Sequence, residues 1–148
     1  MEVRTEIEIS APPAEIWKVL LDFRRYPEWN PFIVRIAGEP NVGSRLEMTV
    51  SLPDSNRERE SEPRLLKCDA EEELRWLDHL WMKGLLDSEQ FVRLEARGDG
   101  TTRIVHGADV TGILLRFMLN QVTETTRGLV YMNQALKRRV EQGARRAR

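Results

Sequence analysis

The chain has a single cysteine, Cys68, and only two histidines, His79 and His106. One cysteine excludes an internal disulfide framework and a metal cluster built from several thiolates of one chain. Neither histidine has a cysteine or carboxylate at ligand spacing, so we expect no metal site. The sequence also lacks a glycine-rich phosphate loop and a dinucleotide-binding fingerprint, so we expect no cofactor.

Long apolar runs and an excess of one charge are also missing. No stretch approaches the ~18–20 apolar residues of a membrane span, and the first residues are charged, unlike a signal segment. Lys and Arg number 23 against 24 Asp and Glu, which disfavours a globally basic nucleic-acid binder. These absences predict a cytoplasmic protein with no transmembrane segment and no nucleic-acid partner.

The length of 148 residues, with 41% hydrophobic residues, predicts one domain over residues 1–148. The chain ends in a basic segment, of which we expect residues 144–148 to be frayed. This segment could contact anionic lipid or RNA. The interpretation we favour is a solvated helix end, where cations suit the negative end of the helix dipole.

The first part of the chain shows two periodicities. Residues 3–9 alternate between apolar and polar side chains, which predicts a half-buried strand. After the pair Pro12-Pro13, apolar residues recur at helical spacing, and the helix should end before Pro27. Aromatic residues framed by prolines in segment 26–32 predict a bent segment or a short helix.

Period-two patterns dominate the middle of the chain. They predict strands at 46–52, 64–69, 74–81, 89–96 and 101–111. The charged segment 53–63, bounded by prolines, is typical of an exposed loop. Helical spacing from Leu115 to Val140 then predicts a long amphipathic helix. Gly128 lies inside this helix and either allows a close approach or is a tolerated surface glycine. Strands grouped between helices predict an α+β domain with an antiparallel sheet that curls around the last helix.

Three segments resemble a known family. They are Ile7–Phe32, with its SAPPAEIW and YPEWNPF stretches; Gly43–Leu46; and Phe91–Leu114, with its FVRLE, GTTRI and VTGIL stretches. Together they resemble the START-like superfamily of polyketide cyclase/dehydrase and lipid-transport domains, also called SRPBCC or Bet v 1-like. The resemblance covers nearly the whole chain. It implies a helix-grip fold, in which a curved antiparallel sheet of six to seven strands wraps around a long C-terminal helix. Two short helices follow the first strand.

The resemblance implies an apolar cavity between sheet and helix, but the fold leaves the function open. Our leading hypothesis is binding or transport of a hydrophobic or aromatic small molecule, lipid- or polyketide-like, in that cavity. A polyketide cyclase/aromatase- or dehydratase-like enzyme is the alternative. A cochaperone or toxin–antitoxin-type interaction protein, with a filled interior and an exposed apolar patch, is a third. The chain could act as a monomer or a homodimer.

From strand alternation, helical spacing and the resemblance, we predict which residues line the cavity. The same residues could instead simply fill a core. The proposed lining residues are Trp29, Phe32, Met48, Val50, Trp76, Ile104, His106, Ala108, Phe117, Met118, Val122 and Tyr131.

His106 is the first candidate for a catalytic residue and Tyr131 the second. On the face assigned inward, a neutral imidazole could hydrogen-bond a ligand or act as a general base. Alternatively, a neighbouring strand satisfies it. Many relatives carry an acid two positions after this histidine, where this chain has Ala108. The missing acid weakens the case for acid–base catalysis.

Overall fold

A computed structural model describes residues 1–80 and 82–146, and the side chains of this part as far as residue 143. Its elements in chain order are β1 (Glu2–Ile9), α1 (Pro13–Leu21), η1 (Phe23–Arg25), α2 (Tyr26–Trp29), β2 (Ile33–Ala37), β3 (Glu47–Ser51), β4 (Glu58–Ser61), β5 (Arg64–Asp69), β6 (Glu73–His79), β7 (Asp87–Ala96), β8 (Thr102–Thr111), η2 (Leu115–Phe117) and α3 (Leu119–Arg146).

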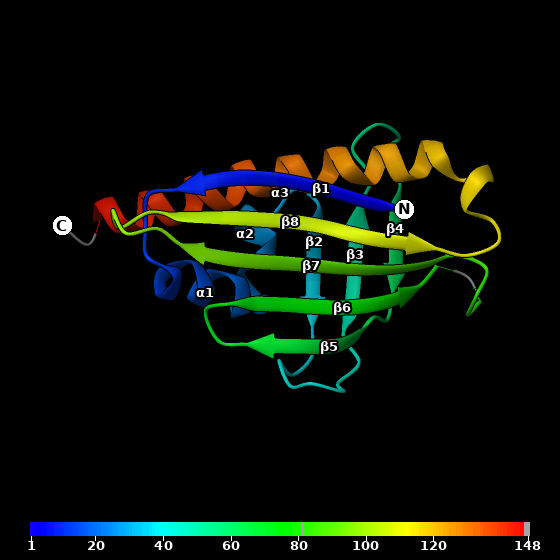
Figure 1. The fold of residues 1–148 in the computed structure, drawn as a ribbon, viewed down its shortest axis with the longest axis horizontal. Helices are drawn as coiled ribbons and strands as arrows, with labels where there is room; N and C mark the ends of the chain where they lie inside the picture. Colours follow the sequence, from blue (N-terminus) through cyan, green and yellow to red (C-terminus); the bar gives the residue numbers. More distant parts are fainter. Residues whose placement is uncertain (81, 147–148) are drawn as a thin grey trace.

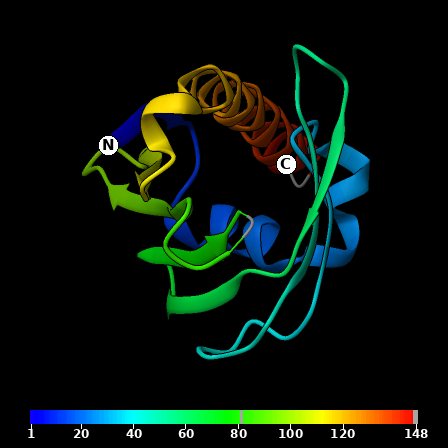
Figure 2. The same ribbon diagram turned by 90° about the vertical axis from the view of Figure 1, so that its right-hand side faces the viewer.

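The strands form two antiparallel sheets, in the orders β1-β8-β7-β6-β5 and β2-β3-β4. Backbone hydrogen bonds between residues 43–46 and 63–65 join the two sheets into one curved surface. The long helix α3 runs along β1 at one edge of the larger sheet (Figure 1). Seen end-on, the two sheets and α3 surround a common interior (Figure 2). This arrangement confirms the predicted α+β helix-grip fold, with two short helices after β1.

The structure differs from the sequence predictions around the smaller sheet. Within the described residues there are eight strands, in sheets of five and three, where six to seven were expected. The segment 53–63 is not all loop, because β4 lies within it, and β2 was not predicted. In β4 the half-buried positions are Arg59 and Ser61. Polar residues at inward positions removed the apolar alternation that would have marked this strand.

Two predicted boundaries reach beyond the described residues. The strand predicted over 74–81 ends at His79, and residue 81 lies outside the described part. The backbone of α3 is helical to Arg146, and residues 147–148 lie outside the described part of the chain. The fraying expected for 144–148 stays a prediction. In the described ranges, no helix is both long and apolar enough to cross a membrane.

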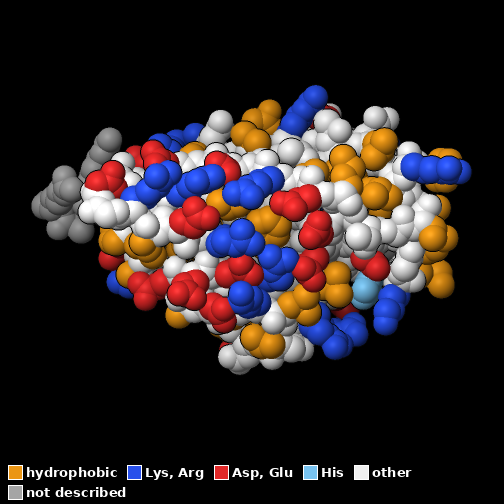
Figure 3. All heavy atoms as spheres, viewed as in Figure 1, with side chains coloured by type: hydrophobic (Ala, Val, Ile, Leu, Met, Phe, Trp, Pro, Cys, Tyr) orange, Lys and Arg blue, Asp and Glu red, His pale blue; other side chains and the backbone are white. Residues whose placement is uncertain are grey.

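The outward face of the larger sheet is covered by charges of both signs (Figure 3). Glu73 accepts hydrogen bonds from Arg75 and Arg93, whose guanidinium groups lie 4.8 and 5.1 Å from the centre of the Phe91 ring. Arg75 also donates to Glu89. This polar layer, which includes the Phe91 ring beneath the two guanidinium groups, faces solvent. Most other apolar side chains of the same strands point to the concave side, toward α3.

One glycine sets the distance between α3 and the start of β2. Gly128 lies in α3, and a Cβ built on it would come closer than 3.0 Å to three atoms of the Phe32 ring. The close approach suggested by Gly128 is therefore real, and the neighbour is an aromatic side chain. Phe32 is 2% exposed and is held in place because Asn30 Oδ1 accepts hydrogen bonds from the backbone N–H groups of Phe32 and Ile33, each 2.9 Å long.

Candidate functional site

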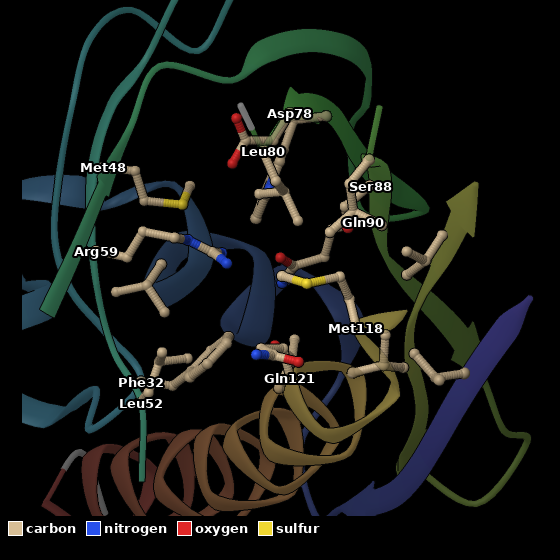
Figure 4. Close-up of a pocket in the computed structure, with 17 residues that line it drawn as sticks. Phe32, Met48, Leu52, Arg59, Asp78, Leu80, Ser88, Gln90, Met118 and Gln121 are labelled. Atoms are coloured by element: carbon tan, nitrogen blue, oxygen red, sulfur yellow. The ribbon is translucent and has the colours of Figure 1, made fainter. Parts of the chain in front are cut away.

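A partly enclosed pocket with a volume of about 160 Å³ lies between the two sheets and α3. Its walls come from β1, β3, β4, β6, β7, β8, segments next to these strands and the start of α3, and they are mostly apolar. Figure 4 shows the lining side chains converging from these elements on a common space. The apolar lining residues are Val3, Phe32, Met48, Val50, Leu52, Trp76, Leu80, Leu86, Val110, Met118 and Val122.

The structure brings half of the proposed lining residues together at this pocket. These residues are Phe32, Met48, Val50, Trp76, Met118 and Val122. Four others are buried or half-buried in the protein but do not line the pocket: Trp29, Ile104, His106 and Ala108. The inward direction assigned to the β8 side chain of His106 agrees with its hydrogen bond to Asn133 on α3, and Ile104 and Ala108 share its face of the strand. These three residues come before Val110 in β8, whereas the pocket lies near the end of that strand, at Val110.

Two proposed lining residues lie on the surface instead. Phe117, in the short turn η2, is 67% exposed, and Tyr131 is 47% exposed. The buried stripe of α3 includes Leu129, Met132 and Leu136. Tyr131 is one residue before Met132, which rotates its side chain about 100° away from this stripe. The placement of Phe117 and Tyr131 in the cavity lining was therefore wrong.

Sequence reasoning missed the polar part of the lining, which consists of Arg59, Asp78, Ser88, Gln90, Gln121 and Thr125. A signal for two of these residues was present. Asp78 is two positions from Trp76 on β6, and Gln90 is two positions from Val92 on β7, so each shares a face with a buried apolar residue. Arg59 carried no such signal, because its segment was interpreted as a loop.

Arg59 and Asp78 are the two charged residues of the lining. Burial lowers the pKa of the Arg59 guanidinium, while the charge of Asp78 acts in the opposite direction. Burial raises the pKa of the Asp78 carboxyl, against the influence of Arg59 and of neighbouring polar groups. Both pKa shifts have the same physical cause, because a poorly solvated space disfavours the charged form of an ionisable group.

His106 lies directly behind the pocket, in a chain of hydrogen bonds. The Thr5 hydroxyl donates a hydrogen bond of 2.6 Å to the backbone carbonyl of His106. Because its one proton is used there, the hydroxyl oxygen accepts the hydrogen bond from Asn133 Nδ2, which is 2.8 Å away. Asn133 Oδ1 then accepts from His106 Nδ1, also at 2.8 Å. In a neutral ring this leaves His106 Nε2 as the acceptor for Gln90 Nε2, again at 2.8 Å.

This chain has two consequences for the site. Burial lowers the pKa of His106 to about 4, so the ring is neutral at pH 7. Because Gln90 donates to His106 through its nitrogen, its carbonyl oxygen remains as an acceptor for the pocket that Gln90 lines. His106 therefore does not face a ligand in the pocket. Instead, His106 determines that the carbonyl oxygen of Gln90 is the atom available to a ligand.

These features define a helix-grip protein with a pocket between its curved sheet and its C-terminal helix. The chain belongs to the family described as polyketide cyclase/dehydrase and lipid transport, whose model matches residues 1–148. No curated protein matches the chain.

Solved structures with the same fold are similar to this chain at low sequence identity. Protein MLL2253 from Mesorhizobium loti has a TM-score of 0.76 at 18% identity, over 96% of this chain and 98% of its own. A START superfamily protein from Mycobacterium smegmatis has a TM-score of 0.69 at 21% identity, over 95% and 97%. DynU16, from the dynemicin biosynthetic locus, has a TM-score of 0.73 at 17% identity. The match covers 96% of this chain but 48% of DynU16.

Proposed function

We propose that this protein binds a hydrophobic or aromatic small molecule, lipid- or polyketide-like, in the pocket between the sheets and α3. The observation that carries the proposal is a partly enclosed pocket whose walls are mostly apolar, with Phe32, Trp76 and Val122 among them. Small-molecule sites have this character, with a few polar groups that orient the ligand. A volume of about 160 Å³ is close to that of an engineered apolar cavity of ~150 Å³ that takes up benzene.

The structure supports ligand binding better than it supports acid–base catalysis by His106 or Tyr131, the two residues first considered as catalytic. Both ring nitrogens of His106 have protein partners, and the ring lies behind Gln90. Tyr131 is on the outer side of α3. A cyclase- or dehydratase-like reaction would need an acid or base that touches the ligand, and neither residue lines the pocket.

The interaction-protein hypothesis combined a filled interior with an exposed apolar patch. Exposed apolar side chains do occur at one end of the molecule, where Met82 and Ile113 lie on segments joined by backbone hydrogen bonds, and Phe117 follows on η2. Figure 3 shows apolar side chains gathered at that end. The interior, however, contains the pocket. The patch therefore supports only half of that hypothesis.

Thermal unfolding with an uncharged probe, 3-phenylpropanol, tests the proposal. A compound that binds only the folded protein stabilises it by ~2.7 kcal/mol at 100-fold excess over Kd. We expect the Tm to rise with the concentration of 3-phenylpropanol.

Val122→Phe should block the pocket, because Val122 is 6% exposed and lines it. We expect the affinity for 3-phenylpropanol, measured by calorimetry, to fall by about tenfold or more, which is ~1.4 kcal/mol. The matched control is Val130→Phe, which adds the same side chain at a position of α3 that is 38% exposed. Unchanged affinity in a folded Val122→Phe variant would contradict a site in this pocket.

A further inference from the structure

The pocket contains a cation that no acid of the described residues contacts. Arg59 lies on β4 between the exposed residues Glu58 and Glu60, so its side chain points inward. Figure 4 shows its guanidinium reaching toward the centre of the pocket, opposite Gln90. Its Nε is buried and has no hydrogen-bond partner within the described part of the chain. A buried guanidinium nitrogen without a partner is costly and rare in folded proteins.

Within the part of the chain that the structure describes, Asp78 is the only acid that lines the pocket, and it forms no ion pair with Arg59. On the outer face of the larger sheet, by contrast, Arg75 and Arg93 form ion pairs at 2.6–3.1 Å. No ion pair within 4.0 Å joins Arg59 to any described acid. The guanidinium therefore has donors left for a molecule that enters the pocket.

The other polar lining groups do not replace this cation. Ser88, Gln90, Gln121 and Thr125 are uncharged. Gln90 offers the pocket an acceptor oxygen, since its nitrogen is bonded to His106. Among the described lining residues, an anionic group that enters the pocket would thus find its charge partner only at Arg59.

We propose that Arg59 binds a carboxylate of the ligand, so that the natural ligand is a small acid with an aliphatic or aromatic body. This inference rests on the proposed function and specifies its ligand class. The body of the acid contacts the apolar wall formed by residues such as Trp76 and Val122. A guanidinium donates two parallel hydrogen bonds to a carboxylate, a geometry that fits one singly charged head group. A phosphate monoester carries about −1.5 to −2 charges, which a single arginine beside Asp78 would neutralise less completely.

A matched pair of probes tests the inference, namely 3-phenylpropionate and 3-phenylpropanol, compared by calorimetry at pH 7.5. We expect the wild-type protein to bind the acid about tenfold more tightly than the alcohol, or better, because a hydrogen bond to a charged group is stronger than a neutral one. Arg59→Gln should bring the ratio close to one, because it should weaken binding of the acid far more than binding of the alcohol. Arg57→Gln is the control, because it removes the same charge from an exposed position outside the pocket and should keep the wild-type ratio.

A second variant keeps the test decisive if Arg59→Gln does not fold. Asp78→Asn removes the one negative charge from the lining and should raise the preference for the acid. A preference that falls or stays the same in Asp78→Asn would overturn the role of Arg59.

The outcomes separate this inference from the proposed function. Equal wild-type affinities for the two probes, or a preference for the acid that survives Arg59→Gln, would overturn the carboxylate site and leave apolar binding intact. Tighter binding of phenyl phosphate than of 3-phenylpropionate would overturn the choice of carboxylate. If neither 3-phenylpropionate nor 3-phenylpropanol binds, the inference and the proposed function both fail.

Discussion

Gly128→Ala should destabilise the protein by about 1–3 kcal/mol, the usual cost of forcing an extra carbon into a packed site. The substitution would ordinarily stabilise a helix by about 1 kcal/mol, so the expected sign is reversed. The reason is the Phe32 ring, three atoms of which would lie closer than 3.0 Å to the new Cβ. Phe32 also lines the pocket, so its displacement should weaken binding of 3-phenylpropanol as well. Urea denaturation and calorimetry measure the two effects.

The same helix supplies the control for Gly128→Ala. A Cβ at Gly143 meets nothing within 4 Å, so Gly143→Ala should show the ordinary helical stabilisation. Adding Phe32→Leu to Gly128→Ala should recover part of the lost stability, because the smaller side chain makes room for the methyl group. If Gly128→Ala is as stabilising as Gly143→Ala, the contact between α3 and Phe32 is not as described.

The second expected result is a loss of stability on acidification that depends on His106. Its pKa in the folded protein is about 4, below the ordinary value of 6.5. As the pH falls through 6.5, His106 binds a proton in the unfolded chain but not in the folded chain. Protonation therefore stabilises the unfolded state relative to the folded state. The stability from this group is complete above pH 6.5, falls by ~1.4 kcal/mol per pH unit below it, and levels off below pH 4. The total loss is about 3 kcal/mol.

Other groups also titrate in this range, so the comparison must be between variants. His79 bonds to Asp87, whose pKa this contact lowers, and Glu73 has its pKa lowered by Arg93 and Arg75 against the effect of burial. His106→Asn keeps a polar side chain but removes the titrating ring. The free energy of unfolding of this variant should be lower at pH 7 but should vary less between pH 7 and pH 4. An identical pH dependence in wild type and variant would refute the buried, neutral His106.

The fold was largely predictable because its signals are local. Alternation in residues 3–9 and 64–69 corresponds closely to β1 and β5, and the helical spacing after Leu115 corresponds to α3. β4 could not be predicted, since its inward positions hold Arg59 and Ser61. These two residues are polar where a sheet normally presents apolar ones, and Arg59 is the residue to which we assign ligand recognition.

The site was harder to predict than the fold because it depends on where the elements meet along their lengths. The alternation of β8 correctly assigned His106 and Ile104 to the inner face. It could not show that the pocket lies toward Val110, at the other end of the same strand. For Tyr131, an error of one residue in helical phase was enough to exchange a buried position for an exposed one.

Gly128 illustrates the same limit. A glycine inside a helix either allows a close approach or is tolerated at the surface, and the sequence shows neither which of the two holds nor which residue would be the neighbour. The neighbour is Phe32 because Asn30 fixes the backbone at the start of β2 and directs the ring toward α3.

The central claim is that the space between the curved sheet and α3 accepts an apolar ligand. A crystal structure of the protein grown with saturating 3-phenylpropanol tests it most directly. Our account predicts electron density for the phenyl ring between Val50 on β3, Trp76 on β6 and Val122 on α3, which all line the pocket. Protein side chains that fill this space, or 3-phenylpropanol bound only elsewhere on the molecule, would contradict it.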